Sequence, residues 1–145
     1  MTVPEVRVEQ ARTTMNAMSR AIQGGLVRAC HDLSEGGLCL AAAEMAIAGR
    51  IGLRLRLADV PYGGPPERRL DQALLFSESN SRFLAEVRPE HREEFEALLT
   101  NVPFARVGRT DESARFIVRG SQGQTLLAAS LEELKRAWQT PLVPH

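Results

Sequence analysis

Polar residues that could do chemistry cluster between a short apolar segment and an alanine-rich one: His31, Asp32, Ser34, Glu35, Gly36 and Gly37. Their order fits a strand, a glycine-bearing turn and the start of a helix. N–H groups at a helix start are unpaired and glycines let an anion approach them, so residues 31–37 could hold a phosphate. A helix cap formed by Ser34 or Asp32 explains the same residues without a ligand. Because the run is not a Walker A loop, spacing leaves both interpretations open.

His31 is the candidate for acid–base chemistry, because imidazole titrates near neutral pH and Asp32 is adjacent in the sequence. Adjacent residues of a strand point to opposite faces, so the two side chains need not touch and a structural histidine is favoured. The sequence has no Ser/His/Asp order, nucleophile elbow, paired metal-ligand spacing or dinucleotide fingerprint. We therefore predict no catalytic residue and no metal ligand in the chain.

A second polar segment places hydroxyl groups, one carboxylate and one guanidinium between apolar stretches: Ser77, Glu78, Ser79, Asn80, Ser81 and Arg82. Arg82 could pair with a phosphate or with Glu78. A polar turn closed by local hydrogen bonds explains the segment equally well without a ligand. Arginines in segments 54–56 and 115–119 stand at strand alternation, and we expect them on a solvated sheet face.

Helical and strand periodicities interleave along the chain. Helices are predicted over residues 6–23, 38–48, 67–75 and 90–99, and after a cap at Ser130. Strands are predicted over residues 26–30, 51–57, 83–87, 104–108, 115–119 and 125–128, with a loop at 61–66. The order lacks the strict repeat of a Rossmann sheet, so we predict an α+β fold with a mixed sheet. Trp138 in the last helix is expected to be a packing anchor.

The length of 145 residues predicts a single domain over residues 1–145, frayed at 1–5 and 141–145. Eighteen basic and eighteen acidic residues give a formal net charge of zero, which argues against a nucleic-acid partner. No apolar run is long enough to span a bilayer, so no membrane role is predicted. Cys30 and Cys39 are too few for a disulfide framework and are expected to be buried free thiols. Without a signal-peptide core, these features predict a cytoplasmic protein.

Taken together, the motifs resemble one family. Residues 29–38 (ACHDLSEGGL), 43–46 (AEMA) and 75–83 (LFSESNSRF) resemble the last domain of formylglycinamidine ribonucleotide synthetase in their order and gaps. Residues 102–108 resemble the strand that follows in this family, and the pattern around Trp138 resembles its C-terminus. Over nearly its whole length the chain is therefore similar to the C-terminal domain of a purine-biosynthesis ligase, in a superfamily with aminoimidazole ribonucleotide synthetase.

The resemblance implies a three-layer α/β/α fold, partly ferredoxin-like. It implies a complete enzyme that uses ATP, Mg²⁺ and glutamine-derived ammonia, with the remaining synthetase domains and a glutaminase as partners. The family's catalytic histidine and magnesium carboxylates match nothing in this chain, so the domain is expected to be inactive alone. By the same resemblance, the phosphate or nucleotide contacts of this chain would be His31, Asp32, Ser34, Glu35, Gly36 and Gly37. By the pseudo-symmetry of the two enzyme halves, the substrate contacts would be Ser77, Glu78, Ser79 and Arg82.

Two other functions compete with this one. The chain could be an autonomous module that binds a ribonucleotide or phosphate without catalysis, or a domain of another ATP-dependent superfamily member such as selenophosphate synthetase. A domain of this kind on its own would expose apolar surface that its neighbours normally cover, so homo-oligomers are also expected.

Overall fold

The computed structural model describes residues 6–63 and 70–140. Its contacts divide the chain into two compact units, residues 1–41 with 75–105 and residues 42–74 with 106–145. The frayed ends predicted at 1–5 and 141–145 lie outside the described residues, as does half of the predicted loop at 61–66.

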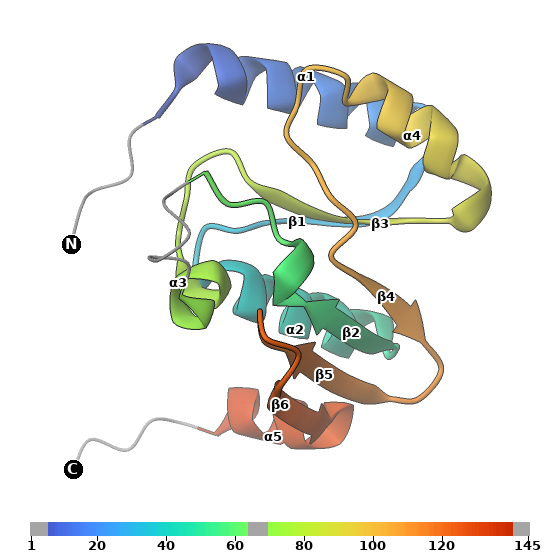
Figure 1. The fold of residues 1–145 in the computed structure, drawn as a ribbon. Coiled ribbons are helices and arrows are strands. Elements are labelled where there is room, and N and C mark those ends of the chain that lie inside the picture. The colour runs from blue at the N-terminus through green and yellow to red at the C-terminus, as the bar shows by residue number, and fades with distance from the viewer. Residues whose placement is uncertain (1–5, 64–69, 141–145) are drawn as a thin grey trace. The chain divides into compact units, whose positions relative to one another are not determined.

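The first unit joins two helices to an antiparallel strand pair (Figure 1). Helix α1 (Val8–Gln23) is followed by β1 (Val27–Asp32), which pairs with β3 (Phe83–Val87). A 3₁₀ turn (Pro89–His91) then leads into α4 (Arg92–Leu98), which packs on α1. One side of α1 is buried at helical spacing, through Ala11, Thr14, Ala17, Met18 and Ala21.

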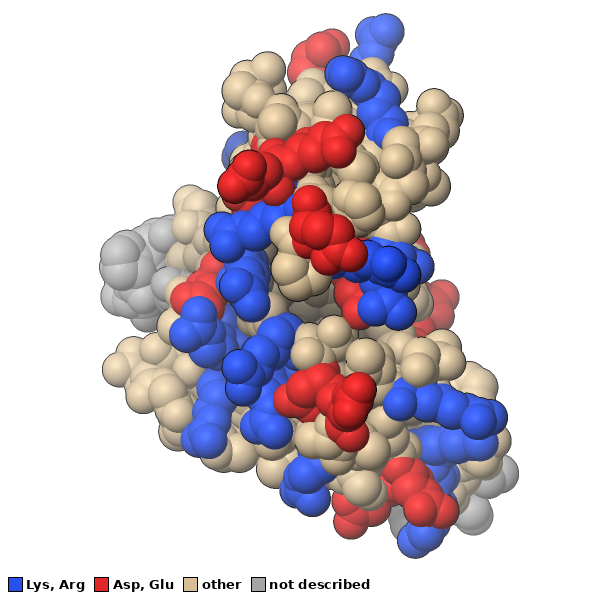
Figure 2. Space-filling model, turned by 90° about the vertical axis from the view of Figure 1, so that its right-hand side faces the viewer, with Lys and Arg blue, Asp and Glu red and all other residues tan. Residues whose placement is uncertain are grey.

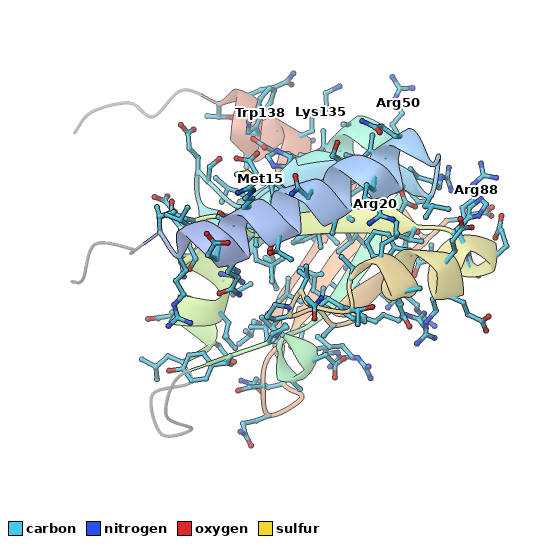
Figure 3. The ribbon with its side chains drawn as sticks, turned by 90° about the horizontal axis from the view of Figure 1, so that it is seen from above. Met15, Arg20, Arg50, Arg88, Lys135 and Trp138 are labelled. Atoms are coloured by element: carbon cyan, nitrogen blue, oxygen red, sulfur yellow. The ribbon has the colours of Figure 1, made fainter. Side chains whose placement is uncertain are left out.

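Another stripe of α1 carries large apolar side chains that no described residue covers well. Val8, Met15 and Ile22 stand seven residues apart and are more than half exposed, at 68%, 53% and 53%. Residues at that spacing share one helix face. Figure 3 labels Met15 on this helix and Trp138 on the last one. Trp138 is 68% exposed, so the prediction that it is a packing anchor was wrong for this chain by itself.

Two helices have residues in both units. Helix α2 (Gly37–Gly49) is buried or half-buried from its start through Ile47, except at Leu40, as its almost wholly apolar sequence predicts. Helix α3 (Asp71–Phe76) is fixed at its first residue, because the Asp71 carboxylate accepts a hydrogen bond from the Ser121 N–H at 2.9 Å.

The second unit is built on a four-stranded sheet in the order β4-β2-β5-β6. Its strands are β4 (Gly108–Asp111), β2 (Gly52–Arg56), β5 (Arg115–Arg119) and β6 (Thr125–Ser130). The β2–β5 pairing is parallel and the other two are antiparallel, so the sheet is mixed. One face forms a core around Leu53, Leu55, Phe116 and Val118. Helix α5 (Leu131–Gln139) follows β6 through the predicted cap, where Ser130 and Glu133 form a capping box.

Most predicted elements are confirmed, and the α+β class with a mixed sheet is confirmed, although the strands form two sheets. The strand predicted at 104–108 was wrong, because pairing with β2 begins only at Gly108. Phe104 is 46% exposed, so this segment has no core to cover. Cys30 is exposed and Cys39 only half-buried, which corrects the expectation of buried thiols. Among the described residues, none of the helices combines the length and the hydropathy that a bilayer-spanning segment needs.

Candidate anion-binding site

The two polar segments predicted from the sequence come together at one end of the β1–β3 pair. The register places Asp32, the last residue of β1, opposite Phe83, the first residue of β3. One residue beyond, the Leu33 N–H donates to the Arg82 carbonyl at 3.0 Å. The antiparallel pairing therefore brings residues 33–37 and 77–82 side by side, although more than forty positions separate Gly36 from Glu78 along the chain.

A direct hydrogen bond joins the segments. The Gly36 N–H donates to Oε1 of Glu78 at 2.9 Å. Gly36 stands immediately before α2, where helix geometry leaves N–H groups without intrahelical partners. A carboxylate at this point also matches the positive end of the helix dipole. At least one of the groups capping this helix start therefore comes from the distant serine-rich turn.

Both glycines of the pair are required by the backbone. Gly36 and Gly37 have φ values of +68° and +64°, a region that side chains other than glycine enter at a cost. A Cβ on Gly37 would lie 2.8 Å from the Leu75 carbonyl oxygen and 2.9 Å from that of Ser77. Helix α2 thus begins directly against the main chain of the second segment.

The serine-rich turn is organised by its own short contacts. The Ser77 and Ser79 hydroxyl oxygens lie 2.8 Å apart and share a hydrogen bond. Ser81 adopts a left-handed conformation, with φ of +60°. Arg82 is half-buried, and this burial lowers the pKa of its guanidinium. In the described part of the chain that guanidinium forms no ion pair, so it does not pair with Glu78.

His31 and Asp32 lie close together after all. The His31 Nδ1 is 2.7 Å from the Asp32 carbonyl and 3.6 Å from its carboxylate, so Nδ1 carries the hydrogen that the carbonyl accepts. The pKa of Asp32 is lowered mainly by a hydrogen bond from the Ser34 hydroxyl. A backbone hydrogen bond and the charge of His31 lower it further. Ser34 is therefore engaged with Asp32, and Glu35 is exposed.

The arrangement favours binding over bond-breaking. Glu78 already accepts from the Gly36 N–H, Ser34 is bonded to Asp32, and Ser77 is bonded to Ser79. The Arg82 guanidinium forms no ion pair with another described residue, so it is the group best able to bind an anion. Asp32 is ionised at neutral pH and cannot act as a general acid there. Within residues 6–63 and 70–140, no group of three or more His, Cys, Asp or Glu side chains could hold a metal ion. A separate hollow of about 360 Å³ between α1 and α4 contains none of the predicted site residues.

The sequence indicates both polar segments but not the contacts that join them. The carbonyls of Leu75 and Ser77 that seat Gly37 carry no sequence signal, because any residue supplies a carbonyl. The strand register that aligns Asp32 with Phe83 was also not predicted. The repeated glycine was the available signal, since adjacent glycines indicate either positive φ or a close backbone approach, and Gly37 has both.

The chain is similar to known proteins over nearly its whole length. It is 35% identical over 140 residues to the phosphoribosylformylglycinamidine synthase subunit PurL of Deinococcus radiodurans, covering 97% of this chain and 18% of that protein. Phosphoribosylformylglycinamidine synthase II of Thermotoga maritima has the same fold, with a TM-score of 0.81 at 20% identity over 99% of this chain and 24% of that one. Structures of T. maritima PurL complexed with FGAR and with ATP also match, each with a TM-score of 0.77.

These relatives are much longer than the chain, which spans less than a fifth of the D. radiodurans protein. The family model for the AIR synthase related protein, C-terminal domain, matches residues 2–121. That match covers most of the 145 residues and includes both polar segments. The chain belongs to the AIR synthase related protein, C-terminal domain family.

Proposed function

We propose that this chain, as one domain over residues 1–145, is the C-terminal domain of phosphoribosylformylglycinamidine synthase, the formylglycinamidine ribonucleotide synthetase of purine biosynthesis. The complete ligase would convert formylglycinamide ribonucleotide, ATP and glutamine-derived ammonia into the amidine in the cytoplasm. The domain would bind and position ligand and would not complete the reaction alone. The similarity to PurL over 97% of the chain supports the assignment.

A binding role is supported by the junction between residues 33–37 and residues 77–82. Gly36 is held by Glu78, and the half-buried Arg82 lies at the end of the same turn without a carboxylate partner among the described residues. Burying a guanidinium without a counter-charge costs free energy, and a bound anion would offset that cost. We assign phosphate or nucleotide contact to His31, Asp32, Ser34, Glu35, Gly36 and Gly37. Substrate contact is assigned to Ser77, Glu78, Ser79 and Arg82.

The required cofactors divide between this domain and the rest of the enzyme. The helix start and Arg82 fit the phosphates of ATP, because both present N–H donors. Magnesium prefers several oxygen ligands, usually including carboxylates. The described residues bring no such group together, so Mg²⁺ would be held by the remaining synthetase domains.

The partners would be those remaining domains and a glutaminase that supplies ammonia. Val8, Met15 and Ile22 form an apolar stripe on α1 that another protein surface would cover. In the isolated chain the same stripe would promote homo-oligomers.

A complementation assay tests the function. The chain is mixed with a D. radiodurans PurL truncated to lack the matching segment, and ATP-dependent amidine formation is measured. We expect a stable complex and restored activity with the native chain, and a complex of reduced activity with Arg82→Ala. Arg20→Ala serves as the control and should restore activity fully, because Arg20 is exposed on a side of α1 away from Val8, Met15 and Ile22. Absence of both complex and activity would contradict the assignment.

Calorimetry separates the assignment from an autonomous sensor. A domain that works only within the ligase should bind formylglycinamide ribonucleotide and ADP weakly by itself. Tight binding by the isolated chain would instead favour a stand-alone ribonucleotide-binding module.

A further inference from the structure

The outward face of the four-stranded sheet is dominated by arginine. Along β2, Leu53 and Leu55 are buried, whereas Arg54 and Arg56 point to the other face. On β5, Arg115 and Arg119 flank the buried Phe116 and Val118 in the same way. The parallel register places Arg56 beside Arg119.

The neighbouring strand adds to this face. The antiparallel register of β2 and β4 puts Arg109 directly opposite Arg54. Like charges in that position destabilise a sheet unless a counter-charge is present. The side chains that we call the arginine face are Arg54, Arg56, Arg109, Arg115 and Arg119. Figure 2 shows basic side chains gathered on the lower half of the displayed surface, with acidic ones between them.

Carboxylates already neutralise part of the arginine face. Arg54 Nε donates to Asp111 Oδ2 at 2.6 Å, and Arg56 Nη2 lies 2.5 Å from Asp59 Oδ2. Hydrogen bonds from Ser130 and, more weakly, the nearby charge of Arg115 lower the pKa of Glu133, so Arg115 is also partly neutralised. Arg109 forms no ion pair within the described ranges. The face therefore keeps an excess of positive charge, although the whole chain has a formal net charge of zero.

We propose that the arginine face docks a carboxylate-rich surface of a different protein or domain. Guanidinium groups can bind carboxylates through two parallel hydrogen bonds. Two arginines of this face already pair with carboxylates of the chain, Arg54 with Asp111 and Arg56 with Asp59. Asp59 and Asp111 would repel a continuous phosphate backbone, which favours a protein partner with mixed charges over a nucleic acid. A second copy does not fit, because a two-fold contact through this face would place arginines against arginines. This inference does not depend on the reaction that the family catalyses.

The probe is a fluorescein-labelled poly-glutamate peptide, titrated with the full chain and followed by fluorescence anisotropy at low salt. We expect saturable binding that weakens as salt is added, because exposed charges are screened. The double variant Arg109→Glu/Arg115→Glu should weaken binding by about tenfold or more, as charge reversal in a charged contact does. Arg12→Glu makes the same kind of charge change on α1 and should leave binding within about twofold of native.

Circular dichroism and melting temperature show whether the variants fold. If the Arg109→Glu/Arg115→Glu variant does not fold, Arg109→Gln/Arg115→Gln removes the same charges without reversing them. The Gln variant should still weaken binding more than Arg12→Gln does. Three results would overturn the proposal: no peptide binding by the native chain, equal weakening by the Arg12 variants, or tighter binding of a poly-deoxythymidine strand or of phosphatidylserine vesicles. The complementation assay measures amidine formation and not peptide binding. A negative result in the peptide titration would therefore leave the proposed function standing.

Discussion

The two sheets place their polar groups in different ways. In the β1–β3 pair the polar residues lie beyond the strand ends, where Gly36 and Glu78 form a site from main chain and turn. In the four-stranded sheet they lie along the strands, where Arg54 and Asp111 form pairs on a face. The first arrangement depends on backbone conformation and close approach. The second depends on side-chain charge, so the two regions should respond differently to substitution and to pH.

Gly37→Ala should lower the free energy of unfolding more than any other substitution considered, because Gly37 has a backbone conformation and a close main-chain contact that alanine cannot adopt without strain. The left-handed φ alone costs about 1–2 kcal/mol for a residue with a Cβ. A further loss is expected because the Cβ would meet main-chain atoms of residues 75–77, which cannot move as a side-chain tip can. Urea unfolding followed by circular dichroism measures the free energy of unfolding.

Gly25→Ala is the matched control for that substitution. Gly25 has a similar φ of +71°, but a Cβ added there would have no neighbouring atom within 4 Å. The same backbone strain is therefore introduced without a steric clash. If the two variants lost equal stability, the close packing of α2 on the serine-rich turn would not matter.

Asp111→Asn should lower the free energy of unfolding by less than Gly37→Ala does, and the loss should depend on pH. The Ser113 hydroxyl, the Arg54 guanidinium and the Ser113 N–H all lower the pKa of Asp111. A lowered folded-state pKa means that the stabilisation is present above the ordinary aspartate pKa of about 4 and is lost as pH falls through the folded value. The variant should therefore have a flatter stability curve between neutral and strongly acidic pH.

Urea unfolding at a series of pH values checks this, with Glu112→Gln as the control. Glu112 is exposed and adjacent in sequence, and its replacement should leave the acid limb of the curve unchanged. An Asp111→Asn curve that parallels the native one would show that charge pairing contributes nothing to the four-stranded sheet.

Much of the fold could be predicted because its signals are local. Alternation in residues 51–57 and 115–119 gave β2 and β5, and the spacing after Ser130 gave the capping box. The segment from Phe104 to Val107 was predicted to be a strand but forms none, and the Phe104 side chain is exposed. Alternation reports what a strand would bury, not whether a partner strand is present.

The site was only half predictable for a similar reason. Residue types indicated two polar segments, and the glycine pair indicated an unusual backbone. That Glu78 caps Gly36 depends on the β1–β3 register, a long-range property with no local signal. The pairing of Arg54 with Asp111 was missed for the same reason, because it follows from the register of β2 with β4.

If residues 33–37 and 77–82 form one anion-binding site, inorganic phosphate should bind there, and backbone NMR can locate that binding residue by residue. On titration into the isotope-labelled chain, the amide signals of Gly36, Gly37 and Ser79 should shift together along one binding curve. Arg82→Ala should reduce these shifts strongly, whereas Arg12→Ala should not. If the shifts were confined to other parts of the molecule, or if both variants reduced them equally, residues 33–37 and 77–82 would not form one anion-binding site.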